Sequence, residues 1–408
     1  MDFSIVSDFN TPNRKKNICG NYQFLIDNHH DNTNQTIRDS TARAAYRNGV
    51  KPKSLTIKPN ALAINVIFDP VEKTKAVGVN YVDLSDSNHR TVQTVMAKQE
   101  IILSAGTLGT PTILMQSGIG DARILMDKFG FSKNEIILNN TEIGQNYLDG
   151  VFTYVQWNVT NELIQNFSLC TPWNSTFGGN NKYYTKQCQL EWKNYTQNEA
   201  NKTIFDTTGF SVGGFFQSPY SPDPDSNDVQ ITLQPYDILL RYNKTNIVTA
   251  QIANNLPQSV GYIGWSHLNS IHDLNHLVSN ASNVVVHGNY LSNEADVNAL
   301  VYGLNLTRSM FNTPAMRKYI VKELFPGNSV NSIQSLREFV VKYQESADHI
   351  VGTCKMGYVV DEELKIMGLK NIRVADASVM PSLPSGNTHA TCMMIGEYAA
   401  QLLLDSAR

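Results

Sequence analysis

The chain has 408 residues, of which 41% are hydrophobic, 17% charged and 9% aromatic, so it is neither a disordered nor a low-complexity protein. At roughly 150 residues per domain the length suggests two or three domains, and no run approaches the ~18 apolar residues of a membrane-spanning helix. Lys and Arg number 33 against 36 Asp and Glu, and this net charge of −3 excludes the basic surface that nucleic-acid binding requires. We therefore expect a globular protein that acts on a small molecule, with no nucleic-acid partner and no membrane span.

Strands dominate the expected elements of the first quarter of the chain. Alternating apolar residues predict strands at 54–57, 61–68 and 76–82, and the turn between the last two predicts a hairpin. A continuous apolar run at 100–106 predicts a buried strand. A helix is expected to begin near Pro111, because proline suits the first helical position.

The second half of the chain begins with a segment that is rich in aromatic residues, Asn and Gly, which is typical of an elaborated cap built from loops. Apolar residues at helical spacing then predict helices. A last apolar run predicts a strand, followed by a Gly/Pro/Ser loop and a helix. The expected elements are the loop-rich cap at 150–235, strands after Val260, helices at 294–309 and 332–343, a strand at 371–377 and a helix at 391–404.

Cysteines and sequons leave the location of the protein open. An odd count of five cysteines, with no CxxC pair, argues against a structural zinc site or a disulfide-built scaffold. Cys170 and Cys188 could still close a disulfide loop in a secreted protein. Ten N-x-[ST] sequons fit either a glycoprotein or an Asn-rich chain: Asn34, Asn139, Asn158, Asn166, Asn174, Asn194, Asn201, Asn243, Asn280 and Asn305.

Two loops near the C-terminus carry the residues best suited to chemistry. His349 lies in ADHIVGTCKMG, and His389 follows Asn387 and Thr388 at the start of the last expected helix. A helix N-terminus offers unpaired N–H groups and a positive dipole end, so His389 would lie where a substrate oxygen could be held. A single histidine in a loop is more often structural, and two such loops around one strand strengthen the functional interpretation only moderately. HDLNH at 272–276 lacks the glutamate and the third ligand of a zinc site, so no metal is expected.

At these residues the sequence resembles the glucose-methanol-choline (GMC) family of flavin oxidoreductases. Five motifs follow one another in the family's order, which chance does not produce. They are RDSTARAAY at 38–46, EIILSAGTLGTPTILMQSGIG at 100–120, IGQNYLDG at 143–150, GYIGWS at 261–266 with HGNYLSNEADVNALVYGLNLTR at 287–308, and the two histidine motifs.

The resemblance implies a mixed α/β (α+β) fold. It predicts an FAD-binding domain made of discontinuous segments and a substrate domain with a mostly antiparallel sheet. Residues 1–150 would form part of the FAD domain, 151–345 the substrate or cap domain, and 346–408 the return to the FAD domain. The family's opening G-x-G-x-x-G turn is missing, so we expect an incomplete FAD domain, completed by a separate N-terminal chain or shortened by gene modelling.

The resemblance also implies an activity and its residues. A GMC protein oxidises the CH–OH group of an alcohol or sugar, with FAD as the cofactor that accepts the hydride. His349 corresponds to the catalytic base, and His389 to the residue that holds the substrate oxygen. The positions that correspond to FAD contacts are Ala105, Gly106, Asp376, Ala377, Asn387, Thr388 and, by a weak alignment, Ala63.

Three interpretations remain open at this point. The chain is part of a working alcohol oxidoreductase, a catalytically silent remnant of one, or a binding module or glycoprotein built on the same fold. The intact histidine motifs favour recent activity, whereas the missing nucleotide fingerprint argues against activity of the chain alone. Gly150, where the family usually has histidine, is a lesser departure. Substrate, electron acceptor and oligomeric state cannot be read from the sequence.

Overall fold

The structure is a computed structural model in which the chain divides into two compact units. Unit 1 comprises 1–51, 151–256 and 293–345, and unit 2 comprises 52–150, 257–292 and 346–408. Each unit is therefore assembled from three separated stretches of sequence. The residues that the structure describes are 4–5, 17–21, 26–27, 37–38, 54–85, 91–164, 212–235, 237–239, 241, 246–266 and 284–406.

The three expected domain ranges stay a prediction, and the two units divide the chain in their own way. The chain changes unit after Gly150 and after Glu345, where domain boundaries were predicted. Of the described residues before Lys51, β1 (Ser4–Ile5) and β2 (Ile18–Asn21) pair into the large sheet of unit 1, whereas the described residues of 257–292 fall in unit 2. The placement of 257–292 has a clear reason, because Trp265 is buried in the hydrophobic core of unit 2.

Unit 2 opens with the predicted hairpin. Strands β5 (Ala61–Phe68) and β6 (Ala76–Asp83) pair antiparallel, and β6 pairs with β7 (Val92–Met96), which the sequence did not predict. The strand predicted at 54–57 is wrong: Ile57 is 56% exposed, so its alternating pattern has no core to face. The other elements are β8 (Ile101–Leu103), α2 (Gly106–Gln116), β9 (Ile119–Gly120), α3 (Ala122–Phe129), η1 (Lys133–Glu135), β10 (Leu138–Asn139), β15 (Tyr262–Trp265), β16 (Val284–His287), β19 (Ile372–Val374), η5 (Ala377–Val379) and α10 (His389–Ser406).

The two buried strands expected at 100–106 and 371–377 are confirmed and lie side by side. β8 pairs with β19 in parallel, with Ile101 opposite Ile372 and Leu103 opposite Val374. Because parallel strands end at the same edge, the loops after β8 and β19 emerge together. Such carboxyl ends are where ligands bind in open parallel sheets.

Helix α2 begins five residues earlier than predicted, so Pro111 lies inside it. Proline has no N–H, and the carbonyl of Thr107 therefore lacks its usual helical donor. The hydroxyl of Thr353 takes that place and donates to the Thr107 carbonyl at 2.6 Å, across 246 residues of sequence. Thr107 in turn donates from its own hydroxyl to the carbonyl of Ile350 at 2.7 Å. The helix tolerates Pro111 because Thr353 of the histidine loop supplies a donor to the Thr107 carbonyl.

Replacing Thr353 with valine should therefore lower the free energy of unfolding by about 1–3 kcal/mol, since it leaves a buried carbonyl without a donor. Thr353→Ser keeps the hydroxyl and serves as the matched control. Urea unfolding with an unchanged m-value measures the difference. Unchanged stability in Thr353→Val together with a loss in Thr353→Ser would mean that the methyl group, and not the hydrogen bond, matters at this position.

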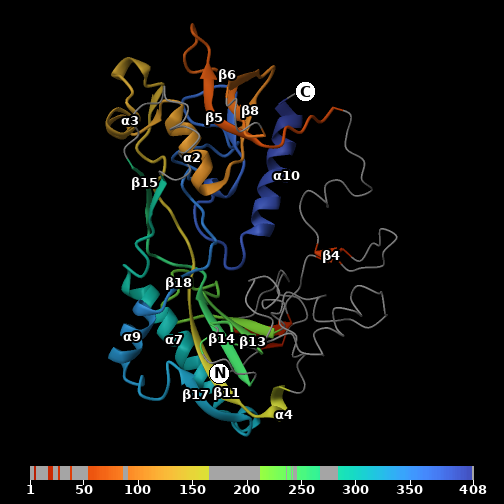
Figure 1. Ribbon diagram of the computed structural model, residues 1–408, viewed down its shortest axis with the longest axis vertical. Coiled ribbons are helices and arrows are strands. Elements are labelled where there is room, and N and C mark those ends of the chain that lie inside the picture. Colours follow the sequence, from red (N-terminus) through yellow and green to blue (C-terminus); the bar gives the residue numbers. More distant parts are fainter. Residues whose placement is uncertain are drawn as a thin grey trace. The chain divides into compact units, whose positions relative to one another are not determined.

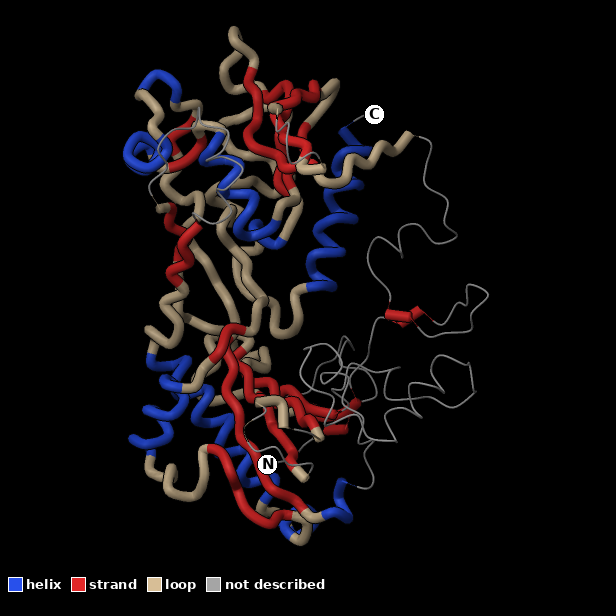
Figure 2. The backbone as a smooth tube through the Cα atoms, in the orientation of Figure 1, coloured by secondary structure: helices blue, strands red, loops and turns tan. Residues whose placement is uncertain are grey.

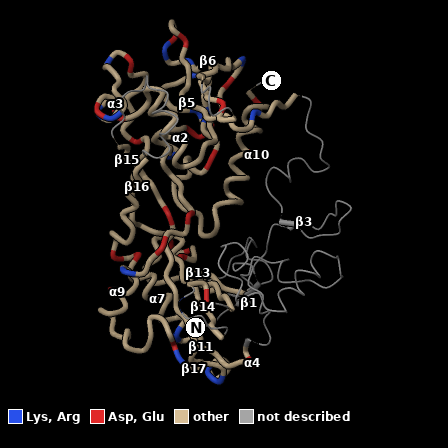
Figure 3. The backbone as a smooth tube through the Cα atoms, viewed as in Figure 1, with Lys and Arg blue, Asp and Glu red and all other residues tan. Residues whose placement is uncertain are grey.

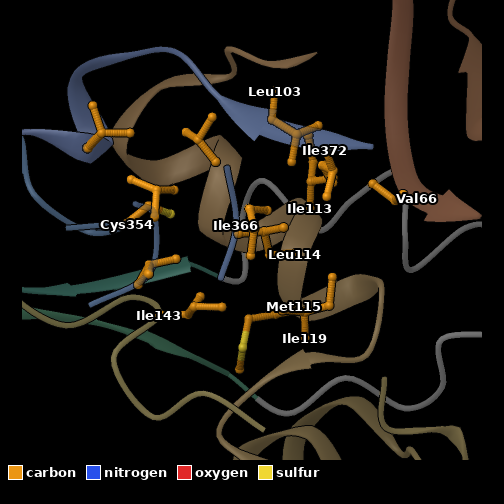
Figure 4. Packing of buried hydrophobic residues seen from close by; sticks show 14 of the residues in the cluster. Val66, Leu103, Ile113, Leu114, Met115, Ile119, Ile143, Cys354, Ile366 and Ile372 are labelled. Atoms are coloured by element: carbon orange, nitrogen blue, oxygen red, sulfur yellow. The ribbon is translucent and has the colours of Figure 1, made fainter. Parts of the chain in front are cut away.

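The hydrophobic core of unit 2 joins its three stretches of sequence. Leu114, Met115 and Ile119 are fully buried, and they pack with residues of the C-terminal stretch such as Cys354 and Ile366. Figure 4 shows these side chains close together, from α2, β9 and the segment before β19. Burial of this core is the main stabilising term of unit 2.

Unit 1 is built on one large sheet covered by helices, as Figure 1 shows for β11, β13, β14 and α7. The strand order is β1-β2-β12-β13-β14-β11-β17, with β18 beside β11. Its elements are β1 (Ser4–Ile5), β2 (Ile18–Asn21), β3 (Ile26–Asp27), β4 (Ile37–Arg38), β11 (Val151–Val159), α4 (Asn161–Ile164), β12 (Val212–Phe216), β13 (Val229–Gln234), β14 (Ile247–Asn254), α7 (Glu294–Phe311), α8 (Pro314–Arg317), β17 (Ile320–Phe325), α9 (Ile333–Lys342) and β18 (Glu345–Ser346).

The two faces of this sheet differ in chemistry. One face is apolar and packs on α7, where Gly303 lets the helix approach Ile252 and Val229 closely. The opposite face carries a polar row across three strands, with Gln156 opposite Thr249 and Thr249 opposite Gln234. The alternation of side chains along each strand separates the two sets.

The helices predicted at 294–309 and 332–343 are confirmed as α7 and α9. Asn293 caps α7 and Ser332 caps α9, each accepting a main-chain N–H with its side chain. The cap expected to consist mainly of loops is wrong for the described part of 150–235, which includes β11, β12 and β13 (Figure 2). Since β11 is buried on both faces, its sequence lacks the alternation that marks a strand. The mixed α/β fold with a mostly antiparallel substrate-domain sheet is confirmed.

Charges in the described chain are mixed: Lys and Arg are scattered among Asp and Glu in both units (Figure 3). None of the helices described has the length and apolar character needed to cross a bilayer. Several sequence features lie outside the described residues. They are the stretch at 39–46, the pair Cys170 and Cys188, the HDLNH segment at 272–276, and the sequons at Asn34, Asn166, Asn174, Asn194, Asn201, Asn243 and Asn280.

Candidate active site

His349 follows a tight turn that begins at Ser346, and its side chain is half-buried. Asp348, immediately before it, has a φ of 57°, a left-handed conformation that non-glycine residues rarely adopt. Its main-chain N–H donates to the Ser346 hydroxyl at 3.0 Å. On the ring of His349, Nε2 lies 3.0 Å from Nδ2 of Asn387. The imidazole is thus held at a defined position by two segments of unit 2.

The environment of His349 favours a neutral ring. Burial lowers the pKa of His349 below its ordinary value, and the negative charges of Asp149 and Asp348 oppose this shift. Because an amide nitrogen can only donate, the placed side chain of Asn387 gives Nε2 the acceptor role, which leaves the ring proton on Nδ1. A neutral imidazole, which has a lone pair on one ring nitrogen, is the form that acts as a general base.

The segment at 143–150 is hydrogen-bonded to the loop that carries this histidine. Leu148 and Val351 exchange main-chain hydrogen bonds of 3.1 and 2.9 Å, and Ala347 donates its N–H to the Gly150 carbonyl at 2.8 Å. Two of the family motifs therefore lie side by side. They are about 200 residues apart in the sequence, as the hydrogen bond from His349 to Asp149 shows.

A buried carboxylate, Asp149, stands at the centre of this contact. Its Oδ1 accepts the main-chain N–H of His349 at 2.9 Å. Its Oδ2 accepts the hydroxyls of Ser346 at 2.5 Å and Tyr290 at 3.0 Å. The hydroxyl of Tyr147 lies 3.1 Å from that of Tyr290 and extends the chain of hydrogen bonds. Burial raises the pKa of Asp149, while the bonds from Ser346 and Tyr290 lower it.

The second predicted histidine opens helix α10. His389 is exposed at the first residue of the helix, and the Thr388 carbonyl accepts the N–H of Cys392 at 2.9 Å in its first turn. The structure brings Asn387, which had been expected to contact the cofactor, onto the ring of His349. The two predicted histidine loops therefore meet through Asn387.

A second cluster lies where β8 and β19 end. Asp376 Oδ2 accepts the N–H of Gly106 at 2.9 Å and the hydroxyl of Thr110 at 2.6 Å, and Oδ1 accepts the Ser378 N–H at 2.8 Å and its hydroxyl at 2.5 Å. Both oxygens of Asp376 are therefore engaged within the protein. The carboxylate caps the start of α2, where the helix has no acidic residue of its own. Gly106 is thus bonded to Asp376 directly, and Ala105 is bonded to the Thr110 hydroxyl that donates to Asp376.

The remaining two predicted cofactor positions lie in different surroundings. Ala377 is half-buried next to Asp376, and its carbonyl accepts the N–H of Gly352 at 3.2 Å. Ala63 lies in β5 and packs against the core of unit 2. Ala377 therefore belongs to the cluster at the strand ends, while Ala63 has a packing role in the described residues.

Sequence reasoning missed the residues that hold the base. Asp149 was noted only as part of a motif, and Tyr290 and Ser346 were not singled out. The one signal was the position of Asp149 beside Gly150, where the sequence departs from the family pattern. Nothing local indicates that this carboxylate folds against a histidine loop far along the chain.

Other reactive groups in the described residues are unsuited to chemistry. No group of three or more His, Cys, Asp or Glu side chains there could hold a metal ion. Burial raises the pKa of the Cys354 thiol and of the Cys392 thiol, which keeps both in the unreactive thiol form.

Comparison with known proteins identifies the family. Two family models described as GMC oxidoreductase match the chain, one at residues 8–151 and the other at 257–396. Human mitochondrial choline dehydrogenase is 32% identical over 378 residues, and the alcohol dehydrogenase [acceptor] of Pseudomonas putida is 31% identical over 380 residues. Each alignment covers 90% of this chain, which spans 56% and 61% of the two relatives.

Solved structures show the same fold. Formate oxidase has a TM-score of 0.70 at 20% identity, and the alignment covers 88% of this chain and 62% of that one. Pyridoxine 4-oxidase from Mesorbium loti has a TM-score of 0.66 at 19% identity and covers 90% of this chain and 63% of its own. The family models, the relatives and the folds agree with the resemblance of the five motifs. The chain belongs to the GMC oxidoreductase family, whose cofactor is FAD.

Proposed function

We propose that the chain acts in an FAD-dependent oxidoreductase that oxidises the CH–OH group of an alcohol or sugar, with His349 as the catalytic base. The observation that carries the proposal is the half-buried, neutral imidazole of His349, whose pKa burial lowers and whose Nε2 lies 3.0 Å from Asn387. The relatives support an alcohol substrate, since two of them are named choline dehydrogenase and alcohol dehydrogenase.

The strand-end cluster fits a dinucleotide. Gly106, the first residue of α2, has a φ of +80°, and a Cβ built there would meet nothing within 4 Å. A cofactor can approach the main chain closely at this open space, while the Gly106 N–H itself already donates to Asp376. Ala105 beside it is small and exposed. Asp376 would act by holding this loop in place, because its two oxygens already accept hydrogen bonds from the protein.

The residues of the base loop then have distinct tasks. His349 would accept the proton of the substrate hydroxyl at Nε2, where that hydroxyl would take the place of the Asn387 amide that donates to this nitrogen in the described structure. His389, at the N-terminus of α10, would hold the substrate oxygen. FAD, when bound, supplies the acceptor for the hydride that leaves the substrate carbon.

We further propose that a polypeptide segment outside this chain, such as a separate N-terminal chain, completes the FAD site. In the described residues the parallel sheet of β8 and β19 has two strands. Parallel sheets are normally larger and covered on both faces, so additional strands beside β8 or β19 would stabilise this edge.

The test is a flavin-binding and reduction experiment. FAD is added to the purified protein, the excess is removed, and the visible spectrum is recorded before and after anaerobic addition of choline, benzyl alcohol or D-glucose. We expect a retained flavin band that one of these substrates bleaches. A colourless protein is assayed again with the N-terminal segment of a GMC relative added. Bound flavin that no alcohol or sugar bleaches would contradict the proposal.

One feature of unit 1 favours the alternative of a ligand-binding protein without catalysis. The carbonyl oxygens of Gln156 and Gln234 are buried on the polar face of the sheet and accept no hydrogen bond in the described structure. Such acceptors are costly unless a ligand or water donates to them, and sugar hydroxyls are suitable donors. Calorimetric binding of D-glucose by protein that never reduces flavin would favour this alternative.

A further inference from the structure

Asp149 is placed to control the conformation of the histidine loop. The residue is 3% exposed, and its two carboxylate oxygens accept three hydrogen bonds, from the His349 main chain, from Ser346 and from Tyr290. A buried carboxylate is costly unless hydrogen bonds compensate it, so this site is built for an acceptor. Two stretches of sequence, the turn at 346–349 and Tyr290, supply the donors, and both are far along the chain from Asp149.

The donors enclose Asp348, the one non-glycine residue of the described loop with a left-handed backbone. Asp348, at φ 57°, lies between Ser346 and His349, and both of these neighbours donate to Asp149. Ser346 also accepts the N–H of Asp348. Residues in such conformations persist where the surroundings over-determine them, and they gather at active sites. The strained turn is therefore held by Asp149 at both ends.

The same carboxylate also lies close to the charge that His349 would gain. The charged and titratable groups that face His349 are Asp149 and Asp348, and Tyr290 with Tyr147 lie behind Asp149. Asn387, on the other side of the ring, is neutral. Asp149 and Asp348 attract a protonated imidazole, whereas burial disfavours it. Removal of the charge at Asp149 thus weakens the affinity of His349 for a proton.

We propose that Asp149 is a positioning residue, which fixes the turn that carries His349 and stabilises the ring once it has taken up a proton, with Tyr290 and Ser346 holding the carboxylate in place. The proposal rests on the proposed function of His349 as a base. It adds a residue that makes no contact with the substrate and acts only through the histidine loop.

The first readout needs neither flavin nor substrate. The protein is labelled on histidine, and NMR follows the titration of His349, assigned by loss of its signal in His349→Gln. We expect Asp149→Asn to lower the pKa of His349, because the substitution removes an attractive negative charge and keeps the shape of the side chain. Asp121→Asn is the matched control, since Asp121 is also buried in unit 2 and contacts Arg123. This control should leave the titration unchanged.

The second readout is turnover of the flavin-loaded protein. A displacement of the base by about 1 Å costs on the order of 10²-fold in rate, so Asp149→Asn should lower kcat by about that factor while KM changes little. Ser346→Ala keeps the charge and loosens the turn, and it should lower kcat less without moving the pKa of His349. Thermal unfolding of each variant identifies any loss that follows from misfolding.

Two results would overturn the proposal. One is a His349 that titrates in Asp149→Asn as it does in the wild type. The other is an equal loss of kcat in Asp121→Asn, which would indicate general destabilisation. A failure of the proposed function looks different: His349→Gln would then keep full turnover, while the titration would still decide whether Asp149 governs the histidine.

Discussion

Replacing His349 with alanine should reduce turnover by a factor of about 10²–10⁴, the usual contribution of a general base, while the protein still retains flavin. The imidazole is the group that Asn387 orients, and its removal leaves no base at that position. Four of the predicted flavin contacts, Ala105, Gly106, Asp376 and Ala377, lie at the ends of β8 and β19 and not on the histidine ring, so we expect cofactor binding to be spared. Anaerobic flavin reduction by an alcohol substrate measures the first effect, and the visible flavin band measures the second.

The pH dependence of turnover provides the internal control for this variant. Burial lowers the pKa of His349, so the neutral base is present down to a lower pH than for an ordinary histidine. Wild-type kcat/KM should rise with pH and level off below the ordinary histidine range, and the residual activity of His349→Ala should lack this limb. Normal turnover in His349→Ala, or a limb that persists in it, would exclude the assignment.

Replacing Arg373 with methionine should lower the free energy of unfolding by about 3–5 kcal/mol, because it leaves a carboxylate without its buried partner. Arg373 is 1% exposed in β19 and donates from Nε to Glu100 at 2.8 Å. Its other nitrogens donate to the Glu363 carbonyl and, at 3.3 Å, to the Ser406 hydroxyl of α10. The guanidinium thus links β8, β19 and the last helix of unit 2.

Urea unfolding measures the loss, with two comparisons beside it. Adding Glu100→Gln to Arg373→Met should recover part of the stability, since the unpaired charge is removed. Arg123→Met breaks an exposed ion pair with Asp121, in which the arginine side chain is 85% exposed, and it should have no measurable effect. A loss in Arg373→Met no larger than that in Arg123→Met would show that the buried pair does not hold unit 2 together.

The sequence predicted those parts of the fold that depend on neighbouring residues. The hairpin of β5 and β6 follows from alternating apolar residues around a turn, and α7 follows from helical spacing after the cap at Asn293. The buried strands β8 and β19 follow from short continuous apolar runs. These patterns depend on the local propensity and burial of one segment, so the residues of that segment are enough to predict its structure.

The strands of unit 1 were harder to recognise for a physical reason. β11 is buried on both faces, and it contributes Gln156 to the polar row that crosses three strands, so it shows no apolar–polar alternation. Pairing with β14 and β17 gives it strand structure. The neighbours that determine its conformation lie more than 80 residues away, as the bond from Gln156 to Asp237 illustrates.

By itself, the sequence determined the family, through the order of five motifs, and it identified His349, Asn387 and His389 as candidate residues. Only the tertiary structure showed that Asn387 lies on the ring of His349, that Asp149 holds the histidine turn, and that Thr353 satisfies the carbonyl freed by Pro111. Each of these contacts joins polar groups far apart in the chain. Burial makes it costly to leave such groups unpaired, so folding selects their partners, and no local pattern records the choice.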